Sequence, residues 1–178
     1  EFLALNTEVK RLCVAYSGGL DSSVLLNLVD DFCKEHNKKN SKALSICALH
    51  LNHGLSPNAS SWEDFCKQTC ETYKCEFIHE LVNIDGVSNV EKKAREKRYQ
   101  FFQDQCGEND VLLMAHHLND QTETLLFRFF RGSSARALIG IPQQRELDHI
   151  QNLDEKKPSK ILRPLLGFSK DQLLNYAE

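Results

Sequence analysis

The sequence lacks the features that mark a membrane span or a disulfide-stapled secreted domain. No stretch approaches the roughly 18 uninterrupted apolar residues that a membrane helix needs, and residues 1–11 do not have the charged and then apolar layout of a signal peptide. The seven cysteines are an odd number without any Cys-x-x-Cys pair, which favours reduced core thiols over disulfides or a metal cluster. We therefore expect a cytoplasmic protein with no membrane partner.

Excess positive charge is also missing. The chain has 22 Lys and Arg against 25 Asp and Glu, a net charge of −3, so the molecule as a whole is not a basic nucleic-acid-binding domain. An RNA partner would have to meet local patches, of which the candidates are Lys92, Lys93, Arg95, Lys97, Arg98, Arg128, Arg131 and Arg136. Such charge runs are also typical of a solvated helix face.

Apolar content is sufficient for one domain with a real core, since 41% of the 178 residues are hydrophobic. Short apolar runs alternate with segments of helical period, which predicts a doubly wound, mainly parallel α/β sheet flanked by helices. We expect strands at Arg11–Tyr16, Ala43–Leu51, Glu76–Val82, Asp110–Ala115 and Lys160–Leu162. Helices are expected from Asp21 to about His36, from Ser60 or Ser61, from Asn89 to about Gln105 and from Asn119 to about Arg131, with Gly132 as a stop.

The last third of the chain is less regular. Residues 143–160 are polar and contain Pro158, so we expect a long excursion or an irregular hairpin there. Residues 169–178 begin a helix and show no terminating signal. We expect residues 1–178 to form a single domain that belongs to a longer protein.

A glycine-rich bend between the first strand and the first helix predicts an anion site. The segment Ser17-Gly18-Gly19-Leu20-Asp21-Ser22 lies at a helix N-terminus, where backbone amides, the helix dipole and serine hydroxyls can meet phosphate oxygens. It has no lysine, and its spacing matches neither the usual P-loop nor Gly-x-Gly-x-x-Gly. A tight turn with a serine cap is the plainer alternative.

Asp21 indicates that the anion site also holds a cation, because a carboxylate and phosphates repel each other unless a cation lies between them. Mg²⁺ is the natural cation, held by Asp21 and the phosphate oxygens.

A second group of polar residues follows the expected strand Asp110–Ala115. His116, Asp120 and Glu123 are spaced by four and three residues, so on a helix they share one face. If this strand and the first strand are neighbours, the group faces the glycine-rich bend, since ligands bind at the carboxyl ends of parallel strands. The alternative is that Asn119 or Asp120 only caps a helix.

These motifs resemble the N-type ATP pyrophosphatase (PP-loop) superfamily and, within it, the transfer-RNA isoleucine lysidine synthetase family. The superfamily loop is matched by residues 17–22, and the narrower family by Leu51-Asn52-His53-Gly54-Leu55, by Asn89-x-Glu91-x-x-Ala94-Arg95-x-x-Arg98-Tyr99 and by residues 115–124. Arg128-Phe129-Phe130-Arg131-Gly132 and Leu162-Arg163-Pro164-Leu165-Leu166 extend the likeness over nearly the whole chain.

The resemblance implies an adenine nucleotide alpha hydrolase-like, Rossmann-like fold and an N-terminal catalytic domain with RNA-binding regions further along. It implies a ligase that uses ATP and Mg²⁺ to adenylate the wobble cytidine of isoleucine tRNA, after which free L-lysine displaces AMP to give lysidine. A homodimer is left open.

The resemblance also implies roles for residues. Asp21, His116, Asp120 and Glu123 are expected to be catalytic, with Asp21 on Mg²⁺, and residues Ser17, Gly18, Gly19, Leu20, Asp21, Ser22, His53 and Gly54 to bind the nucleotide. Substrate contacts are expected from Arg95, Arg98 and Arg163. Asn119 and Ala137 depart from the family pattern, which usually has an acid and a glycine at these positions.

Two other functions stay open at this point. A cytidine-thiolating enzyme of the same fold would need paired cysteines, and a regulatory ATP-binding module would retain the fold without turnover.

Overall fold

A single six-stranded sheet organises the chain, for which the computed structural model describes residues 8–52, 59–82, 89–132, 139–147 and 159–178. The strands are β1 (Arg11–Ala15), β2 (Ser45–Asn52), β3 (Glu76–Leu81), β4 (Asp110–Leu113), β5 (Gln144–Glu146) and β6 (Lys160–Leu162). Their order is β3-β2-β1-β4-β6-β5, and every neighbouring pair is parallel except β5 with β6. The expected doubly wound, mainly parallel sheet is confirmed.

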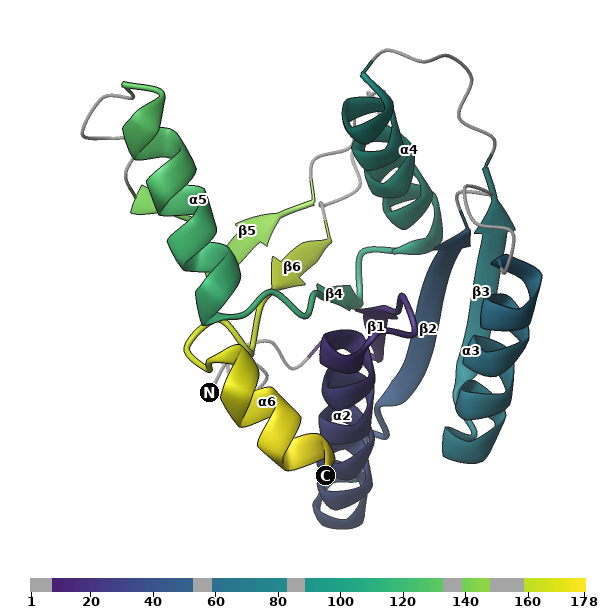
Figure 1. Cartoon of the computed structure of the whole chain (residues 1–178). Coiled ribbons are helices and arrows are strands. Elements are labelled where there is room, and N and C mark those ends of the chain that lie inside the picture. The colour runs from purple at the N-terminus through teal and green to yellow at the C-terminus, as the bar shows by residue number, and fades with distance from the viewer. Residues whose placement is uncertain (1–7, 53–58, 83–88, 133–138, 148–158) are drawn as a thin grey trace.

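Helices cover both faces of this sheet (Figure 1). They are α2 (Leu20–Lys39), α3 (Ala59–Tyr73), α4 (Val90–Gln105), α5 (Leu118–Phe130) and α6 (Lys170–Ala177). No helix in the described ranges is both long and apolar enough to span a membrane.

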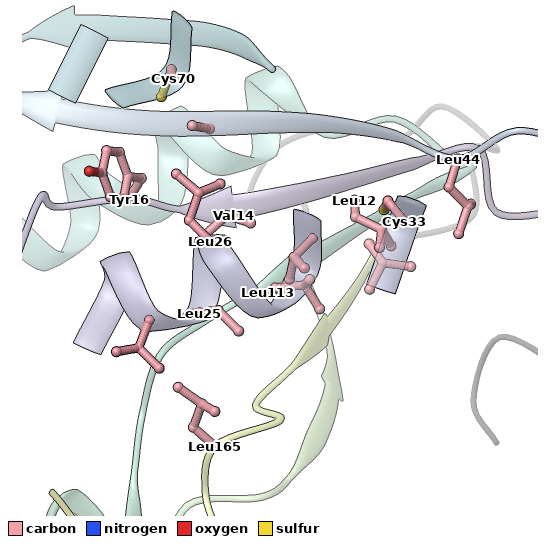
Figure 2. Close-up of a cluster of buried hydrophobic side chains, with 14 of the residues drawn as sticks. Leu12, Val14, Tyr16, Leu25, Leu26, Cys33, Leu44, Cys70, Leu113 and Leu165 are labelled. Carbon is pink, nitrogen blue, oxygen red and sulfur yellow. The ribbon is translucent and has the colours of Figure 1, made fainter. Parts of the chain in front are cut away.

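The core has two layers because successive side chains of a strand point to opposite faces. Leu12, Val14 and Tyr16 of the β1 region pack with Leu25 and Leu26 of α2, as Figure 2 shows. Cys13 faces the other layer, where the buried Phe101 and Phe102 of α4 lie. The cysteines within these layers are free thiols, as the sequence predicts.

Strand and helix positions agree closely with the sequence prediction. The five expected strands are present with ends shifted by at most two residues, and α2 runs three residues past its expected end. A long excursion or an irregular hairpin was expected within residues 143–160. The described residues of this segment form the antiparallel β5–β6 pair, and residues 148–158 lie outside the described ranges. Strand β5 itself was not predicted.

The topology fixes where a ligand can bind. From β1 the chain moves through α2 to β2 and β3, and it then returns to place β4 on the other side of β1. After β1 the chain therefore continues towards one edge of the sheet, and after β4 it continues towards the other edge. The place between these two neighbouring strands is the switch point, where α/β sheets bind ligands.

Candidate functional site

The glycine-rich bend, residues 17–22 and hereafter the phosphate loop, is held by its own hydroxyl groups. The hydroxyl of Ser22 donates to the carbonyl of Gly19 (3.0 Å) and accepts from the amide of Ser17 (3.3 Å). The two serine hydroxyls are also within 3.1 Å of each other. Ser22 is buried, so it braces the loop, while the first-turn amides of α2 lack intrahelical acceptors and remain suited to an anion.

Gly18 adopts a left-handed backbone conformation with φ +78°. A Cβ at this position would also lie 2.6 Å from the sulfur of Cys66 and 2.9 Å from the Nε1 of Trp62, both on α3. The loop needs glycine here because it packs directly against α3. Gly19, by contrast, has an ordinary extended backbone with φ −73°.

His117 joins the phosphate loop to the segment after β4. Its Nε2 lies 3.7 Å from the Oδ2 of Asp21, and its Nδ1 lies 3.6 Å from the Oδ2 of Asp120. The imidazole itself is buried. Through these two distances the three side chains form one small polar group between the start of α2 and the start of α5. The sequence prediction that these two segments meet is confirmed.

One oxygen of this group is suited to a cation. The Oδ1 of Asp21 is buried and has no hydrogen-bond partner within the described ranges. A buried acceptor without a donor is costly, and a bound cation removes that cost. No cluster of three or more His, Cys, Asp or Glu ligands occurs in the part of the chain that the structure describes. A single carboxylate nevertheless fits Mg²⁺, which at nucleotide sites is held by one or two carboxylates together with phosphate oxygens and water.

His116 points away from its neighbour His117. The backbone of His117 is extended, with φ −124° and ψ −177°, and α5 begins only at Leu118. Adjacent side chains on extended backbone project to opposite sides, so His116 meets Arg163 beyond β6 instead of Asp21. The Nε of Arg163 donates to the Nδ1 of His116 (3.3 Å), and its Nη1 donates to the carbonyl of Pro142 (2.7 Å).

This contact determines the protonation of His116. Burial lowers the pKa of His116, and the charge of Arg163 lowers it further. Since Nδ1 accepts from Arg163, the proton of the neutral ring lies on Nε2, which leaves a donor for a ligand. The negative charge of Asp120 acts in the opposite direction and raises the pKa of His116.

A basic cluster lies beside His116 and is centred on Tyr99 of α4. The guanidinium carbons of Arg145 and Arg95 lie 4.8 Å and 5.5 Å from the centre of the Tyr99 ring. Arg98 is close enough for its charge to lower the pKa of His116. Arg95 and Arg98 are exposed, whereas Arg163 is buried.

Two further predicted site residues, Asp120 and Glu123, lie on α5. Asp120 accepts a hydrogen bond from the backbone amide of His117 (2.8 Å), so it caps the helix as well as facing the imidazole. Glu123 is exposed, one helical turn beyond Asp120. The side chain of Asn119 accepts from the backbone amide of Lys170 (3.0 Å), which ties α5 to the start of α6.

The sequence reasoning thus identified both segments of the site but missed three of its residues. His117, Trp62 and Arg145 were not singled out, although His117 directly adjoins His116 in the same motif. His53 and Gly54 lie outside the described residues.

Comparisons with known proteins find relatives over nearly the whole chain. A model of the PP-loop domain family matches residues 1–178. The tRNA(Ile)-lysidine synthase of Coxiella burnetii is 37% identical over 180 residues, covering 100% of this chain and 37% of its own length. Those of Haemophilus influenzae strain PittGG and of Pseudomonas syringae are 42% and 39% identical, over 93% and 92% of this chain. The chain spans 36% and 34% of these two relatives.

Solved structures show the same fold at low sequence identity. The U34-tRNA thiolase NcsA from Methanococcus maripaludis, described with its [4Fe-4S] cluster, has a TM-score of 0.66 at 20% identity and covers 94% of this chain and 56% of its own. The NAD+ synthetase from Burkholderia pseudomallei has a TM-score of 0.56 at 13% identity, covering 99% and 67%. These likenesses show a shared fold and do not select among the reactions.

Proposed function

Because this chain belongs to the PP-loop domain family, we propose that it binds ATP and forms the catalytic domain of a ligase that converts the wobble cytidine of isoleucine tRNA to lysidine. The names of the curated relatives support this reaction. The observation on which the proposal chiefly rests is the group Asp21, His117 and Asp120, which brings both motifs to one place at the switch point.

The proposed reaction has two steps. In the first, the carbonyl oxygen of the cytosine ring attacks the α-phosphorus of ATP, and the bond to pyrophosphate breaks. In the second, the amine of free lysine bonds to the ring carbon that bears the adenylate, and AMP leaves with the electron pair of the broken C–O bond. Adenylation supports the second step because it replaces a poor leaving oxygen with a good one.

The phosphate loop is assigned to the triphosphate. Its glycines and the first turn of α2 offer amides to phosphate oxygens. Ser17 is exposed beside this turn, where its side chain can meet the ligand. Ser22 is assigned to bracing the loop, because its hydroxyl donates to Gly19.

Asp21 is the residue proposed to hold Mg²⁺, through the buried oxygen that has no partner in the described ranges. When bound, the ion neutralises phosphate charge during attack at phosphorus. The Nε2 of His117 lies 3.7 Å from the other oxygen of Asp21, and His117 is assigned to positioning this carboxylate.

His116, Asp120 and Glu123 are assigned to the reacting centre. The neutral His116 can donate from Nε2 to a phosphate or to the leaving oxygen, while Arg163 holds its ring. The carboxylates of Asp120 and Glu123, one turn apart on α5, are suited to binding the ammonium group of lysine and accepting its proton.

The basic cluster around Tyr99 is assigned to the tRNA backbone or the adenylate. Arg95 and Arg98 of α4 are exposed, and the guanidinium of Arg145 on β5 lies over the Tyr99 ring. Local positive charge of this kind is what an RNA partner requires when the net charge of the chain is −3.

The protein that contains this chain should be incubated with ATP, lysine and isoleucine tRNA bearing cytidine at the wobble position. We expect pyrophosphate release to require the tRNA, and lysine to become covalently attached to it. The matched control is the same tRNA with uridine at that position, which should support neither. Pyrophosphate release that is indifferent to both lysine and tRNA would contradict the proposal.

A further inference from the structure

Trp62, the only tryptophan in the chain, contacts the phosphate loop from α3. Its indole Nε1 donates a hydrogen bond to the backbone carbonyl of Ser17 at 2.7 Å. Trp62 is 49% exposed, and its ring lies 5.7 Å from the ring of Phe65, centre to centre. A half-exposed tryptophan whose polar atom bonds to a loop backbone does more than fill the core.

The same stretch of α3 forms a wall behind Gly18. The space that a Cβ of Gly18 would take is occupied by the Sγ of Cys66 and the Nε1 of Trp62. Cys66 is fully buried, and burial raises the pKa of its thiol to about 11, so it is a neutral packing group. The Ser17–Gly18 peptide therefore lies directly against α3.

This wall is fixed to the sheet. Glu63, which adjoins Trp62, accepts a hydrogen bond from the side chain of Asn52 on β2 (3.0 Å). Its other carboxylate oxygen lies 2.9 Å from the Nδ1 of His79 on β3. Glu63 therefore joins α3, next to Trp62, to two strands of the sheet.

Peptide geometry links this contact to ligand binding. The carbonyl of Ser17 and the N–H of Gly18 belong to one planar, trans peptide group, so they point in opposite directions. A carbonyl held towards α3 turns the N–H of Gly18 away from α3. Without the indole bond, the carbonyl of Ser17 loses the side-chain donor that fixes its direction.

We propose that Trp62 is a positioning residue for phosphate binding, which sets the Ser17–Gly18 peptide so that the amide of Gly18 is presented to the phosphates of the nucleotide. This rests on the proposed function, because it presumes that the loop binds a nucleotide. In this proposal Trp62 acts through the loop backbone, and it affects the binding of the phosphates but not that of the adenosine part of the nucleotide.

The test compares three probes, MgATP, magnesium pyrophosphate and adenosine, on the wild type and on Trp62→Phe. Loss of one hydrogen bond should raise the dissociation constants of MgATP and pyrophosphate about fivefold, the equivalent of about 1 kcal/mol. That of adenosine, which has no phosphate, should not change. The control is Phe65→Leu, which alters the adjacent exposed ring and should bind all three probes as the wild type does.

A second replacement guards against a folding defect. Site-specific replacement of Trp62 by an analogue with sulfur in place of the ring N–H removes only the donor, and it should give the same fivefold change at an unaltered melting temperature.

Wild-type affinity for pyrophosphate in both altered proteins would overturn the inference, and so would an equal loss of adenosine affinity, which would make Trp62 a base-stacking residue. If the wild type itself binds neither MgATP nor pyrophosphate, the proposed function fails, and this inference fails with it.

Discussion

Asp21 combines two environments in one carboxylate. Its Oδ2 faces His117, while its Oδ1 is buried and without a partner within the described ranges. This asymmetry is expected of a carboxylate that completes its contacts with a cation and a phosphate. We therefore expect replacement of Asp21 to lower the rate of the reaction and to leave the stability of the fold largely unchanged.

We predict that Asp21→Asn lowers the rate of tRNA-dependent pyrophosphate release by about 100-fold or more, the range seen when one electrostatic group is removed from a transition state. The melting temperature should stay the same or rise, because the change removes the charge of a carboxylate whose Oδ1 is buried without a partner in the described ranges. Asp31→Asn is the control, since it makes the same change at an exposed position of the same helix. Equal rates for the two variants would remove Asp21 from the reaction.

His116 should make the stability of the fold sensitive to acid. Its pKa in the fold is below the ordinary value of about 6.5. The unfolded chain therefore binds more protons between these two values, and stability rises with pH across this window. The stabilisation from neutral His116 is present above about pH 6.5 and is lost as the pH falls through the folded pKa.

Urea unfolding of the wild type and of His116→Asn at pH 7.5, 6.5 and 5.5 measures this effect. Asparagine keeps an acceptor for Arg163 but does not titrate. We expect the free energy of unfolding of the wild type to fall more steeply towards acid than that of the variant. Parallel curves would show that His116 titrates alike in the folded and unfolded chains.

At the scale of elements, the phosphate loop and α3 form one packed unit. The two adjacent glycines serve it differently, since Gly18 has a positive φ and meets Cys66 and Trp62, whereas a Cβ at Gly19 would meet only Ser17, at an ordinary 3.5 Å. The sequence pattern does not distinguish them, because both fit the same loop motif.

We predict that Gly18→Ala lowers the free energy of unfolding by about 1–3 kcal/mol, the range for a strained backbone position. Gly19→Ala should cost about 1 kcal/mol at most, as a change at a helix N-cap, yet it should still weaken MgATP binding because its methyl group is near the approaching phosphate. Chemical denaturation and calorimetry of both variants measure the two effects. A larger loss of stability for Gly19→Ala would contradict the packing described for the loop.

Local backbone geometry also explains which site residues the sequence could not predict. Helical spacing places His116, Asp120 and Glu123 on one face, but α5 begins after His117. His116 and His117 therefore lie on extended backbone and diverge, one towards Arg163 and the other towards Asp21. The sequence predicted that the two segments meet, whereas the identity of the bridging histidine depended on where the helix starts.

At the scale of the whole molecule, the parallel sheet could be predicted because its strands are apolar runs separated by helical segments. The exception is β5, which consists of Gln144, Arg145 and Glu146 at the edge of the sheet. An edge strand of polar residues has no apolar alternation to detect. Two contacts join segments more than 40 residues apart, that of Arg145 with Tyr99 and that of Trp62 with Ser17. They follow from tertiary packing alone, so the sequence pattern does not predict them.

The order of strands also accounts for the site, since β1 and β4 are neighbours only because the chain reverses direction across the sheet. The central claim is that the segments following these strands serve one triphosphate. A crystal structure of the protein with Mg²⁺ and a non-hydrolysable ATP analogue tests it most directly. We predict that the phosphates lie on the amides of residues 17–22 with the ion on Asp21, and that the α-phosphorus faces His116 and Asp120. A nucleotide that contacts only one of the two segments would contradict the account.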